Sequence, residues 1–293
     1  MDARDSQSRR RKPAWLKKSL PRGDGIRRVE NILKRHALHT VCRGARCPNR
    51  NDCYQEGTAT FLIMGDVCTR QCRFCSIPGR RPDPLDRDEP ERLARAVEKM
   101  GLSYVVVTSV TRDDLADGGA GHFVAVTAAI KARLPAARIE LLVPDFQGDL
   151  DAVDAVLDGA PTVFNHNVET VPALYGAVRP GADYDRSLSI LKHAARRRPI
   201  PVKSGFMLGL GEKDDAVRAL LDDLEKAGVA IVTVGQYLKP AEGCIEVFDY
   251  VPPERFDAVA AWARERGFRA VASGPFVRSS YRAAELAREA GLG

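Results

Sequence analysis

Short apolar runs recur along most of the chain, and each is followed by a stretch whose apolar residues have helical spacing. From Thr58 onward these runs are rich in β-branched residues and predict strands at residues 59–64, 104–108, 139–143, 162–165, 202–208, 231–235 and, more weakly, 270–273. Helices are predicted at residues 89–100, 121–134, 150–158, 183–197, 214–227, 253–266 and 283–290. The alternation predicts an α/β fold in which helices surround a parallel sheet.

The predicted strands show little alternation of polar and apolar residues, as in sheets that are buried on both faces. Six or seven strand–helix units are compatible with a partial barrel or with a doubly wound sheet. No Gly-x-Gly-x-x-Gly follows the first predicted strand, so a dinucleotide-binding Rossmann domain is not indicated. In a barrel, chemistry gathers at the carboxyl ends of the strands. Polar residues stand at several of these ends: Thr108, Ser109, residues 165–169, Lys203, Ser204 and Gln236.

Residues 1–56 are different, because they are basic, interrupted by proline and rich in cysteine. Only residues 29–38 are predicted to be helical in this part. We therefore divide the chain into an N-terminal extension (1–56), a barrel (57–275) and a C-terminal segment (276–293) that contains Arg278-Ser279-Ser280-Tyr281.

Composition narrows the class of protein. Hydrophobic residues make up 44% of the 293 residues, enough for a substantial core. No run of 18 apolar residues occurs, so no membrane span is expected, and the polar N-terminus is not a secretory signal. We therefore expect a cytoplasmic protein, in which disulfides are disfavoured.

The net charge of +6 comes partly from a basic leader. Its cations are Arg9, Arg10, Arg11, Lys12, Lys17, Lys18, Arg22, Arg27 and Arg28. Two readings stay open: a solvated leader without a partner, or a basic surface that meets an acidic protein. No basic stripe with interleaved aromatic residues is present, so nucleic acid is not an expected partner.

Six of the seven cysteines form two triplets. The first triplet is Cys42-x4-Cys47-x5-Cys53, and the second is Cys68-x3-Cys72-x2-Cys75, in the loop after the first predicted barrel strand. Three protein ligands leave one position of a metal site open for chemistry. Zinc remains an alternative, because Cys72-x2-Cys75 is half of a zinc ribbon, although no matching second pair is present.

The second triplet, with Phe74 before its last cysteine, resembles the C-x3-C-x2-C signature of radical S-adenosylmethionine (SAM) enzymes. The resemblance implies a partial TIM-type (β/α)6 barrel, in agreement with the strand count. It also implies that Cys68, Cys72 and Cys75 hold a [4Fe-4S] cluster whose open iron binds SAM. One electron from that cluster would cleave SAM and give a 5′-deoxyadenosyl radical.

The first triplet resembles the C-x4-C-x5-C segment of lipoyl synthases, and the similarity covers about Lys12 to Ala283. Matching stretches are residues 12–17, 108–119, 164–170, 178–180, 203–212, 235–238 and 278–283. The resemblance implies a second, auxiliary [4Fe-4S] cluster, held by Cys42, Cys47, Cys53 and a serine of the Arg-Ser-Ser-Tyr stretch. That serine is Ser280 by alignment, with Ser279 as the alternative. Simple helix capping by the serines is the structural reading of the same residues.

The family implies that SAM is bound by residues at the strand ends: Thr108, Ser109, Asn167, Glu169, Arg179, Gly209 and Gly211. Gly205, Gly209 and Gly211 would border the adenosine, although they could equally form a turn that needs positive φ. His166 is predicted to be a core residue, and Cys244 is predicted to be structural. Thr111 departs from the aspartate expected there, so a catalytic role for that position is doubtful.

The resemblance implies sulfur insertion at C6 and C8 of a protein-bound octanoyl-lysine, with the auxiliary cluster as the sulfur donor. Expected partners are an octanoylated lipoyl-domain or glycine-cleavage carrier protein, a ferredoxin or flavodoxin, and an iron–sulfur carrier; no nucleic acid or membrane is expected. One rival is another two-cluster radical SAM enzyme, such as a biotin-synthase-like sulfur inserter. The other is a zinc- or cluster-stabilised binding protein without turnover.

Overall fold

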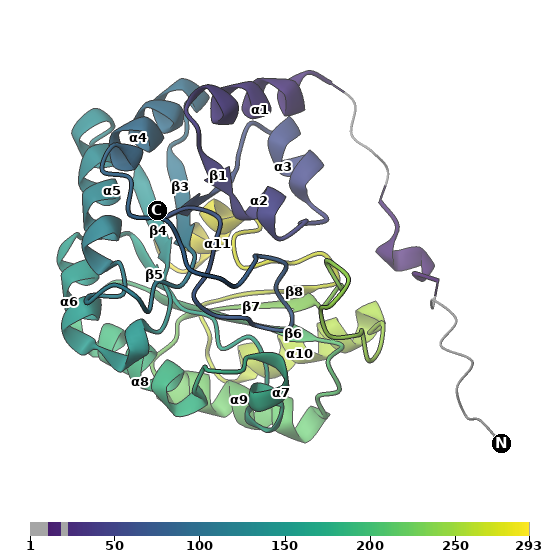
Figure 1. Ribbon diagram of the computed structural model, residues 1–293. Helices are drawn as coiled ribbons and strands as arrows, with labels where there is room; N and C mark the ends of the chain where they lie inside the picture. The colour runs from purple at the N-terminus through teal and green to yellow at the C-terminus, as the bar shows by residue number, and fades with distance from the viewer. Residues whose placement is uncertain (1–10, 19–22, 293) are drawn as a thin grey trace.

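The computed structural model describes residues 11–18 and 23–292 (Figure 1). Of the basic leader, Arg9, Arg10 and Arg22 lie outside these residues. The described strands form one sheet in which spatial order follows sequence order. The strands are β1 (His39–Thr40), β2 (Thr60–Ile63), β3 (Tyr104–Ser109), β4 (Arg138–Leu142), β5 (Val163–Asn165), β6 (Val202–Leu208), β7 (Ile231–Gln236) and β8 (Ala270–Gly274).

The sheet is an open, partial barrel. Strands β2 to β8 pair in parallel, and the two-residue β1 pairs antiparallel with β2. The order never reverses, so the sheet has no topological switch point and is not doubly wound. Among the described strands, β1 and β8 are the two edges, which confirms the predicted partial (β/α)6 barrel.

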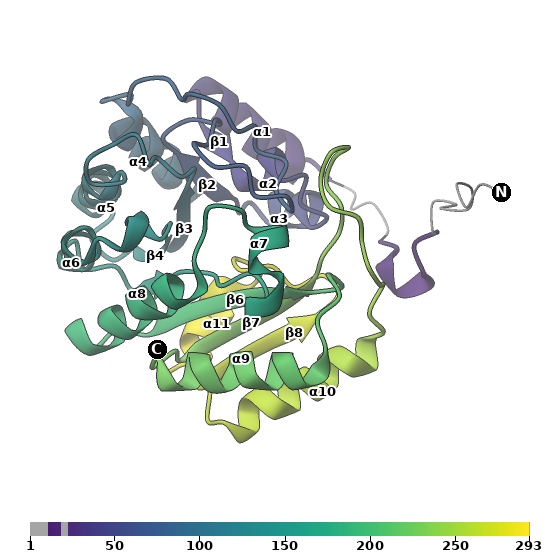
Figure 2. The same ribbon diagram turned by 60° about the horizontal axis from the view of Figure 1, so that its bottom comes forward.

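Six helices cover the outside of the barrel, one after each of the strands β2 to β7 (Figures 1 and 2). They are α4 (Glu89–Met100), α5 (Ala120–Arg133), α6 (Leu150–Asp158), α8 (Tyr184–Arg197), α9 (Asp214–Lys226) and α10 (Pro253–Glu265). The last helix, α11 (Ala283–Glu289), buries Leu286 and Ala287 against the first residues of β5, β7 and β8. The chain therefore passes from the carboxyl end of β8 to the opposite end of the barrel.

The N-terminal part contains more structure than the sequence predicted. Helix α1 spans Gly25–Arg35, earlier than the predicted 29–38, and the expectation of a single helix in residues 1–56 is wrong. Two short helices form around the first cysteines, α2 (Val41–Gly44) and α3 (Arg50–Gln55), and a 3-10 turn, η1, spans Ala14–Leu16. The hydroxyl of Thr40 caps α2 by accepting a hydrogen bond from the Arg43 N–H. Helices of one or two turns have too few residues to show an apolar period.

A buried polar network lies inside the barrel. The Lys203 ammonium donates to Glu140 Oε1 at 2.8 Å, and both side chains are almost fully buried. The Tyr104 hydroxyl donates to Glu140 Oε2, and the Asn165 amide donates to Oε1. A buried charge needs such partners, because it would otherwise have to be neutral. Around this network, apolar residues of strands and helices, from Val29 in α1 to Phe268, form one core.

In the part of the chain that the structure describes, no helix has the length and apolar character that a bilayer crossing requires.

Candidate functional site

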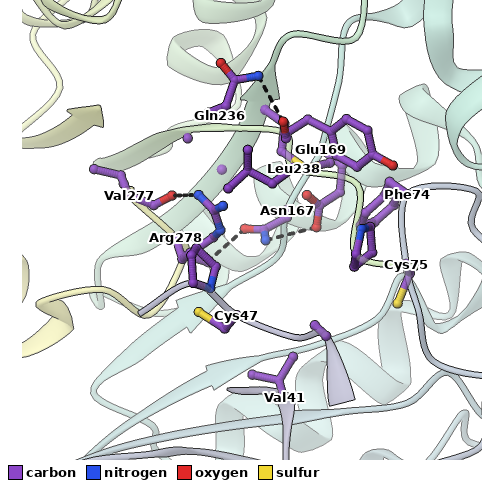
Figure 3. Close-up of a pocket in the computed structure, with 18 of the residues that line it drawn as sticks. Val41, Cys47, Phe74, Cys75, Asn167, Glu169, Gln236, Leu238, Val277 and Arg278 are labelled. Atoms are coloured by element: carbon purple, nitrogen blue, oxygen red, sulfur yellow. Dashed lines mark hydrogen bonds between the residues drawn. The ribbon is translucent and has the colours of Figure 1, made fainter. Parts of the chain in front are cut away.

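Both cysteine triplets reach one cavity of about 470 Å³ at the carboxyl ends of the barrel strands (Figure 3). Cys42 and Cys47 of the first triplet and Cys75 of the second triplet line it. In Figure 3, Cys47 and Cys75 stand apart, with Asn167 and Glu169 between them. Residues 277–280 of the C-terminal segment line the same cavity. The cavity therefore joins elements from both ends of the chain.

The first triplet is brought together by α2 and α3. The Cys47 N–H donates to the Cys42 carbonyl, and the Cys53 N–H donates to the Asn49 carbonyl. Burial raises the pKa of Cys42 to about 11, with a further contribution from Cys47. Burial, Cys42 and Cys47 likewise raise the pKa of Cys53 to about 12. The raised pKa values of Cys42 and Cys53 mean that these two thiols must lose a proton before they bind metal.

The two serines have different surroundings. Ser280 Oγ accepts a hydrogen bond from Thr60 Oγ1 at 2.7 Å, and Thr60 also hydrogen-bonds the Cys42 thiol. Ser279 Oγ accepts from Asn165 Nδ2 at 2.9 Å and donates to Asn167 Oδ1 at 3.1 Å. Ser280 is therefore the serine beside the first triplet, and Ser279 is the serine bound to the barrel.

The second triplet lies in the loop between β2 and α4. Main-chain hydrogen bonds fix the loop, from Cys68 N to Pro78 O and from Cys75 N to Cys72 O, each at 3.0 Å. Burial raises the pKa of Cys72, with a contribution from Cys68, and raises the pKa of Cys75 to about 12. The N–H groups of Arg70 and Thr111 approach Cys68 Sγ at 3.4 and 3.3 Å. Such N–H···S contacts are among the features that tune iron–sulfur potentials.

Arg70 clamps this loop to the barrel. Its guanidinium donates to both oxygens of Asp113, at 2.7 and 2.8 Å, and to both oxygens of Asp145, at 2.8 and 2.6 Å. Burial alone would raise the pKa of Asp145, but the Arg70 hydrogen bonds and charge outweigh it and lower that pKa to about 2. Thr111 acts here through its main chain, since its carbonyl accepts from the Thr69 N–H and hydroxyl. The site thus does not use the side chain of Thr111, whose identity departs from the family pattern.

The donor sets fit two iron–sulfur clusters better than a zinc ion. Each triplet supplies three free thiols from one short stretch of the chain, Cys42 to Cys53 and Cys68 to Cys75. Within residues 11–18 and 23–292, no three His, Cys, Asp or Glu side chains are arranged to hold a single metal ion. A four-iron cluster binds each cysteine to a different iron, so its ligands surround a cube and do not converge on one ion.

Asn167, Glu169 and Gly205 are the expected SAM residues that line the cavity. Asn167 Nδ2 donates to Glu169 Oε1 at 3.0 Å. Glu169 has a φ of +67°, an uncommon conformation for a non-glycine residue. Its N–H donates to the Gly205 carbonyl and its carbonyl accepts from the Met207 N–H, and both partners belong to β6. Burial raises the pKa of Glu169, and the nearby Arg179 opposes that rise. Arg179 itself donates to the Asn167 carbonyl at 3.0 Å and therefore supports the main chain that carries Asn167 and Glu169.

The other expected SAM residues do not line this cavity. Thr108 Oγ1 donates to the Leu142 carbonyl at 2.9 Å, and Ser109 Oγ is buried without a hydrogen-bond partner. Gly209 and Gly211 have φ values of +96° and +106°, so the turn after β6 does require glycine. His166 is buried, as predicted, and burial lowers its pKa to about 4. The Cys244 thiol donates to the Cys75 carbonyl at 3.4 Å.

No role was predicted from the sequence for two further site residues, Thr60 and Arg278. Thr60 lies inside an apolar strand, and only its contact with Ser280 marks it. Arg278 lines the cavity and donates to the Val277 carbonyl at 2.6 Å. Burial lowers the pKa of Arg278, while Cys47 and Glu169 oppose that change. A cation directly before two serines was a possible signal for this residue.

Known proteins of one family resemble this chain over most of its length. The radical SAM superfamily matches residues 62–224, and the N-terminal domain of lipoyl synthase matches residues 2–47. The lipoyl synthase of Nitrosococcus oceani is 53% identical over 277 residues, covering 94% of this chain and 86% of that protein. The chain belongs to the lipoyl synthase family. The Thiobacillus denitrificans member is 50% identical, covering 98% of this chain and 93% of that protein.

Solved structures similar to this member of the lipoyl synthase family agree on the fold. The FeFe-hydrogenase maturase HydG from Carboxydothermus hydrogenoformans aligns with a TM-score of 0.60 at 18% identity, covering 72% of this chain and 52% of HydG. Methylornithine synthase aligns with a TM-score of 0.56 at 14% identity, covering 85% and 77% of the two chains. At these identities the likeness shows the fold alone.

Membership in the lipoyl synthase family confirms the predicted reaction class and cofactors. The chain is a radical SAM enzyme of lipoyl synthesis, a reaction that uses SAM and [4Fe-4S] clusters and inserts sulfur into an octanoyl chain on a carrier protein.

Proposed function

We propose that the two triplets divide the work of the reaction. In this proposal Cys68, Cys72 and Cys75 hold the catalytic cluster, and Cys42, Cys47, Cys53 and Ser280 hold the auxiliary cluster. When bound, the catalytic cluster and SAM supply the radical that removes hydrogen from C6 and C8, and the auxiliary cluster supplies the sulfur. The observation that carries the proposal is that one cavity is lined by Cys42 and Cys47 of the first triplet and by Cys75 of the second. A substrate chain in that cavity would face both.

The choice of Ser280 over Ser279 rests on their hydrogen bonds. Ser279 Oγ is already engaged by two amides of the barrel, whereas Ser280 Oγ lies beside Thr60 and thus beside Cys42. A serine oxygen is a harder ligand than a thiolate and suits iron less well. Ser280 would therefore complete the cluster and still release its iron as sulfur is consumed.

The chain's own residues bind and orient SAM and the substrate. Asn167 and Glu169 are the groups we propose to meet the ribose hydroxyls, with Arg179 as their support. No contact with SAM is proposed for Thr108, Ser109, Gly209 or Gly211, because these residues lie outside the cavity lining. Apolar side chains form much of the wall, which suits an alkyl chain; they include Leu142, Phe206, Met207, Leu238 and Val277.

The proposed partners follow from this reaction. An octanoylated lipoyl domain or glycine-cleavage carrier would present its lysine arm to the cavity, where Lys12, Arg46 and Lys239 line the wall. A ferredoxin or flavodoxin would supply electrons, and an iron–sulfur carrier would rebuild the auxiliary cluster. A cytoplasmic location would keep the thiols reduced.

Anaerobic reconstitution followed by one turnover assay tests the proposal. The chain should take up about eight iron atoms, two clusters of four. Incubated with SAM, a reductant and an octanoyl-lysyl peptide, it should give a peptide in which two sulfur atoms replace two hydrogens, as read by mass. Stoichiometric zinc would favour a binding protein without turnover. SAM cleavage without sulfur insertion would favour a different two-cluster radical SAM enzyme.

A further inference from the structure

Three distant parts of the chain meet at the side chain of Asn49. Asn49 lies between Cys47 and Cys53 and is only 1% exposed. Its amide nitrogen donates to the Phe276 carbonyl at 2.6 Å, a contact between residues 227 positions apart. Its amide oxygen accepts from the Lys18 ammonium at 2.6 Å. The loop of the first triplet, the N-terminal extension and the C-terminal segment are thus joined at one residue.

Lys18 strengthens this junction. Its ammonium lies 4.5 Å from the centroid of the Phe276 ring and also pairs with Asp52 in α3. The cation thus contacts the same two segments that Asn49 connects. We call residues Lys18, Asn49 and Phe276 the latch.

The latch acts on the segment that carries Ser280. Phe276 stands four residues before Ser280, and a second attachment lies between them, because Ser279 is bound to Asn165 and Asn167 of the barrel. The segment is therefore held to the loop of the first triplet at Phe276 and to the barrel at Ser279. Together with the hydrogen bond that Thr60 of β2 donates to Ser280 Oγ, these two attachments hold Ser280 beside the first triplet.

We propose that Asn49 is a positioning residue, which holds the C-terminal segment closed so that Ser280 stays beside the first triplet. The inference rests on the proposed role of Ser280 as the fourth ligand. An amide is suited to this place because it both donates to Phe276 and accepts from Lys18, whereas a carboxylate of the same shape accepts only. Loss of the donor alone should therefore loosen the segment.

Asn49→Asp is the decisive variant, and Asn51→Asp is its matched control. Both add one negative charge to α3 or its N-terminus, but the Asn51 amide oxygen accepts a side-chain hydrogen bond from the neighbouring Arg50 alone, at 3.5 Å, among the described residues. Hydrogen exchange is followed in the full-length chain without clusters, at the Val277 and Tyr281 amides, which donate to Gly274 and Arg278. Asn49→Asp should speed their exchange about tenfold, and Asn51→Asp should leave it unchanged.

A spectroscopic measurement links the latch to the cluster. In a full-length chain with Cys68, Cys72 and Cys75 replaced by alanine, only the first triplet is reconstituted, and its iron is read by Mössbauer spectroscopy. Ser280→Ala should change the signal of one iron. Asn49→Asp should show part of that change and faster iron loss to a chelator, and Asn51→Asp should match the parent.

The outcomes separate the two proposals. If Ser280→Ala leaves the iron signal unchanged, Ser280 is not a ligand, and the proposed cluster and the role of Asn49 both fail. If Ser280→Ala changes the signal but Asn49→Asp behaves like Asn51→Asp in both measurements, the latch alone is overturned. Should Asn49→Asp not fold, Lys18→Met replaces it, with a smaller change expected in the same direction and no change contradicting the latch.

Discussion

Arg70 shows how a single side chain positions a whole cluster loop. It lies between Cys68 and Cys72, and its guanidinium reaches Asp113 after β3 and Asp145 after β4. The Arg70 side chain is 9% exposed and that of Asp145 is fully buried, so the charges are compensated mainly by one another. Only a guanidinium can bind two carboxylates in this bidentate way, since a lysine offers one point charge.

Arg70→Lys should therefore disturb the second triplet while keeping its charge. We expect the free energy of unfolding to fall by about 2 kcal/mol, because the lysine leaves part of the buried carboxylate pair without donors. SAM cleavage should fall more than SAM binding does. Urea unfolding and the formation of 5′-deoxyadenosine measure the two effects.

Arg133→Lys is the control for that variant. Arg133 pairs with Glu91 and Glu98 on the surface, where a lysine can replace it with little change in stability. Equal losses in the two variants would show that Arg70 has no special place in the fold.

The acid stability of the protein should depend on Asp145. Its pKa falls from 3.8 to about 2 on folding, so its carboxylate stabilises the fold above pH 4, and this contribution is lost as pH falls from about 4 to about 2. The contribution is about 2 kcal/mol by linkage. Asp145→Asn should lower stability at pH 7 and lose less stability than the parent between pH 4 and pH 2. Parallel pH profiles of urea midpoints in the cluster-free chain would contradict this account.

At the scale of elements, the turn from β6 to α9 depends on glycine. Gly209 has a φ of +96°, and a Cβ there would lie 2.2 Å from Gln236 Nε2 and 2.5 Å from the Asp249 carbonyl. Gly209→Ala should therefore cost about 2 kcal/mol or more, because both the conformation and the contact resist the methyl group. Thermal unfolding measures the loss.

Gly176 provides the matched control. It lies in α7 (Tyr175–Val178), outside the left-handed region, and a Cβ there would meet nothing within 4 Å. Gly176→Ala should be neutral or slightly stabilising, since alanine favours a helix. A loss as large as that of Gly209→Ala would show that the turn after β6 has no particular strain.

The elements that sequence predicts well are the long, apolar ones. The bounds of α4, α6 and β6 agree with the predictions, and the other barrel elements differ by one or two residues. The short elements β1, α2, α3 and α7 were not predicted, because each has too few residues to show a periodic pattern of apolar positions. Spacing also predicted the two cysteine triplets, because cysteines a few residues apart in the sequence stay close together in one loop. Asn49 with Phe276 and Thr60 with Ser280 could not be predicted, because such contacts depend on tertiary packing.

At the scale of the whole molecule, segments that lie far apart in the sequence line one cavity. The first triplet comes from the N-terminal extension, the second from the barrel, and Ser280 from the C-terminal segment. The barrel sheet is open, and its last strand leads into the segment that closes over the cavity. Because the two triplets are separate, we predict that a substitution can remove sulfur insertion and leave SAM cleavage in place.

Cys47→Ala and Cys72→Ala test this separation, since both cysteines are half-buried. Cys72→Ala should abolish SAM cleavage and sulfur insertion together, because the catalytic cluster serves both. Cys47→Ala should retain SAM cleavage and lower sulfur insertion by roughly a hundredfold, because only the sulfur donor is disturbed. Formation of 5′-deoxyadenosine and the mass of the octanoyl-lysyl peptide are measured in one reaction.

Cys244→Ala is the control that makes the separation specific to the triplets. Its thiol only donates to the Cys75 carbonyl in the described structure, so both products should stay within about twofold of the parent. Equal loss of both products in Cys47→Ala would mean that the two triplets serve one step, and the proposed division would be wrong. Retained sulfur insertion in Cys47→Ala would instead place the sulfur donor elsewhere. Because Cys47 of the first triplet and Cys75 of the second line the same cavity from different segments, we expect neither result.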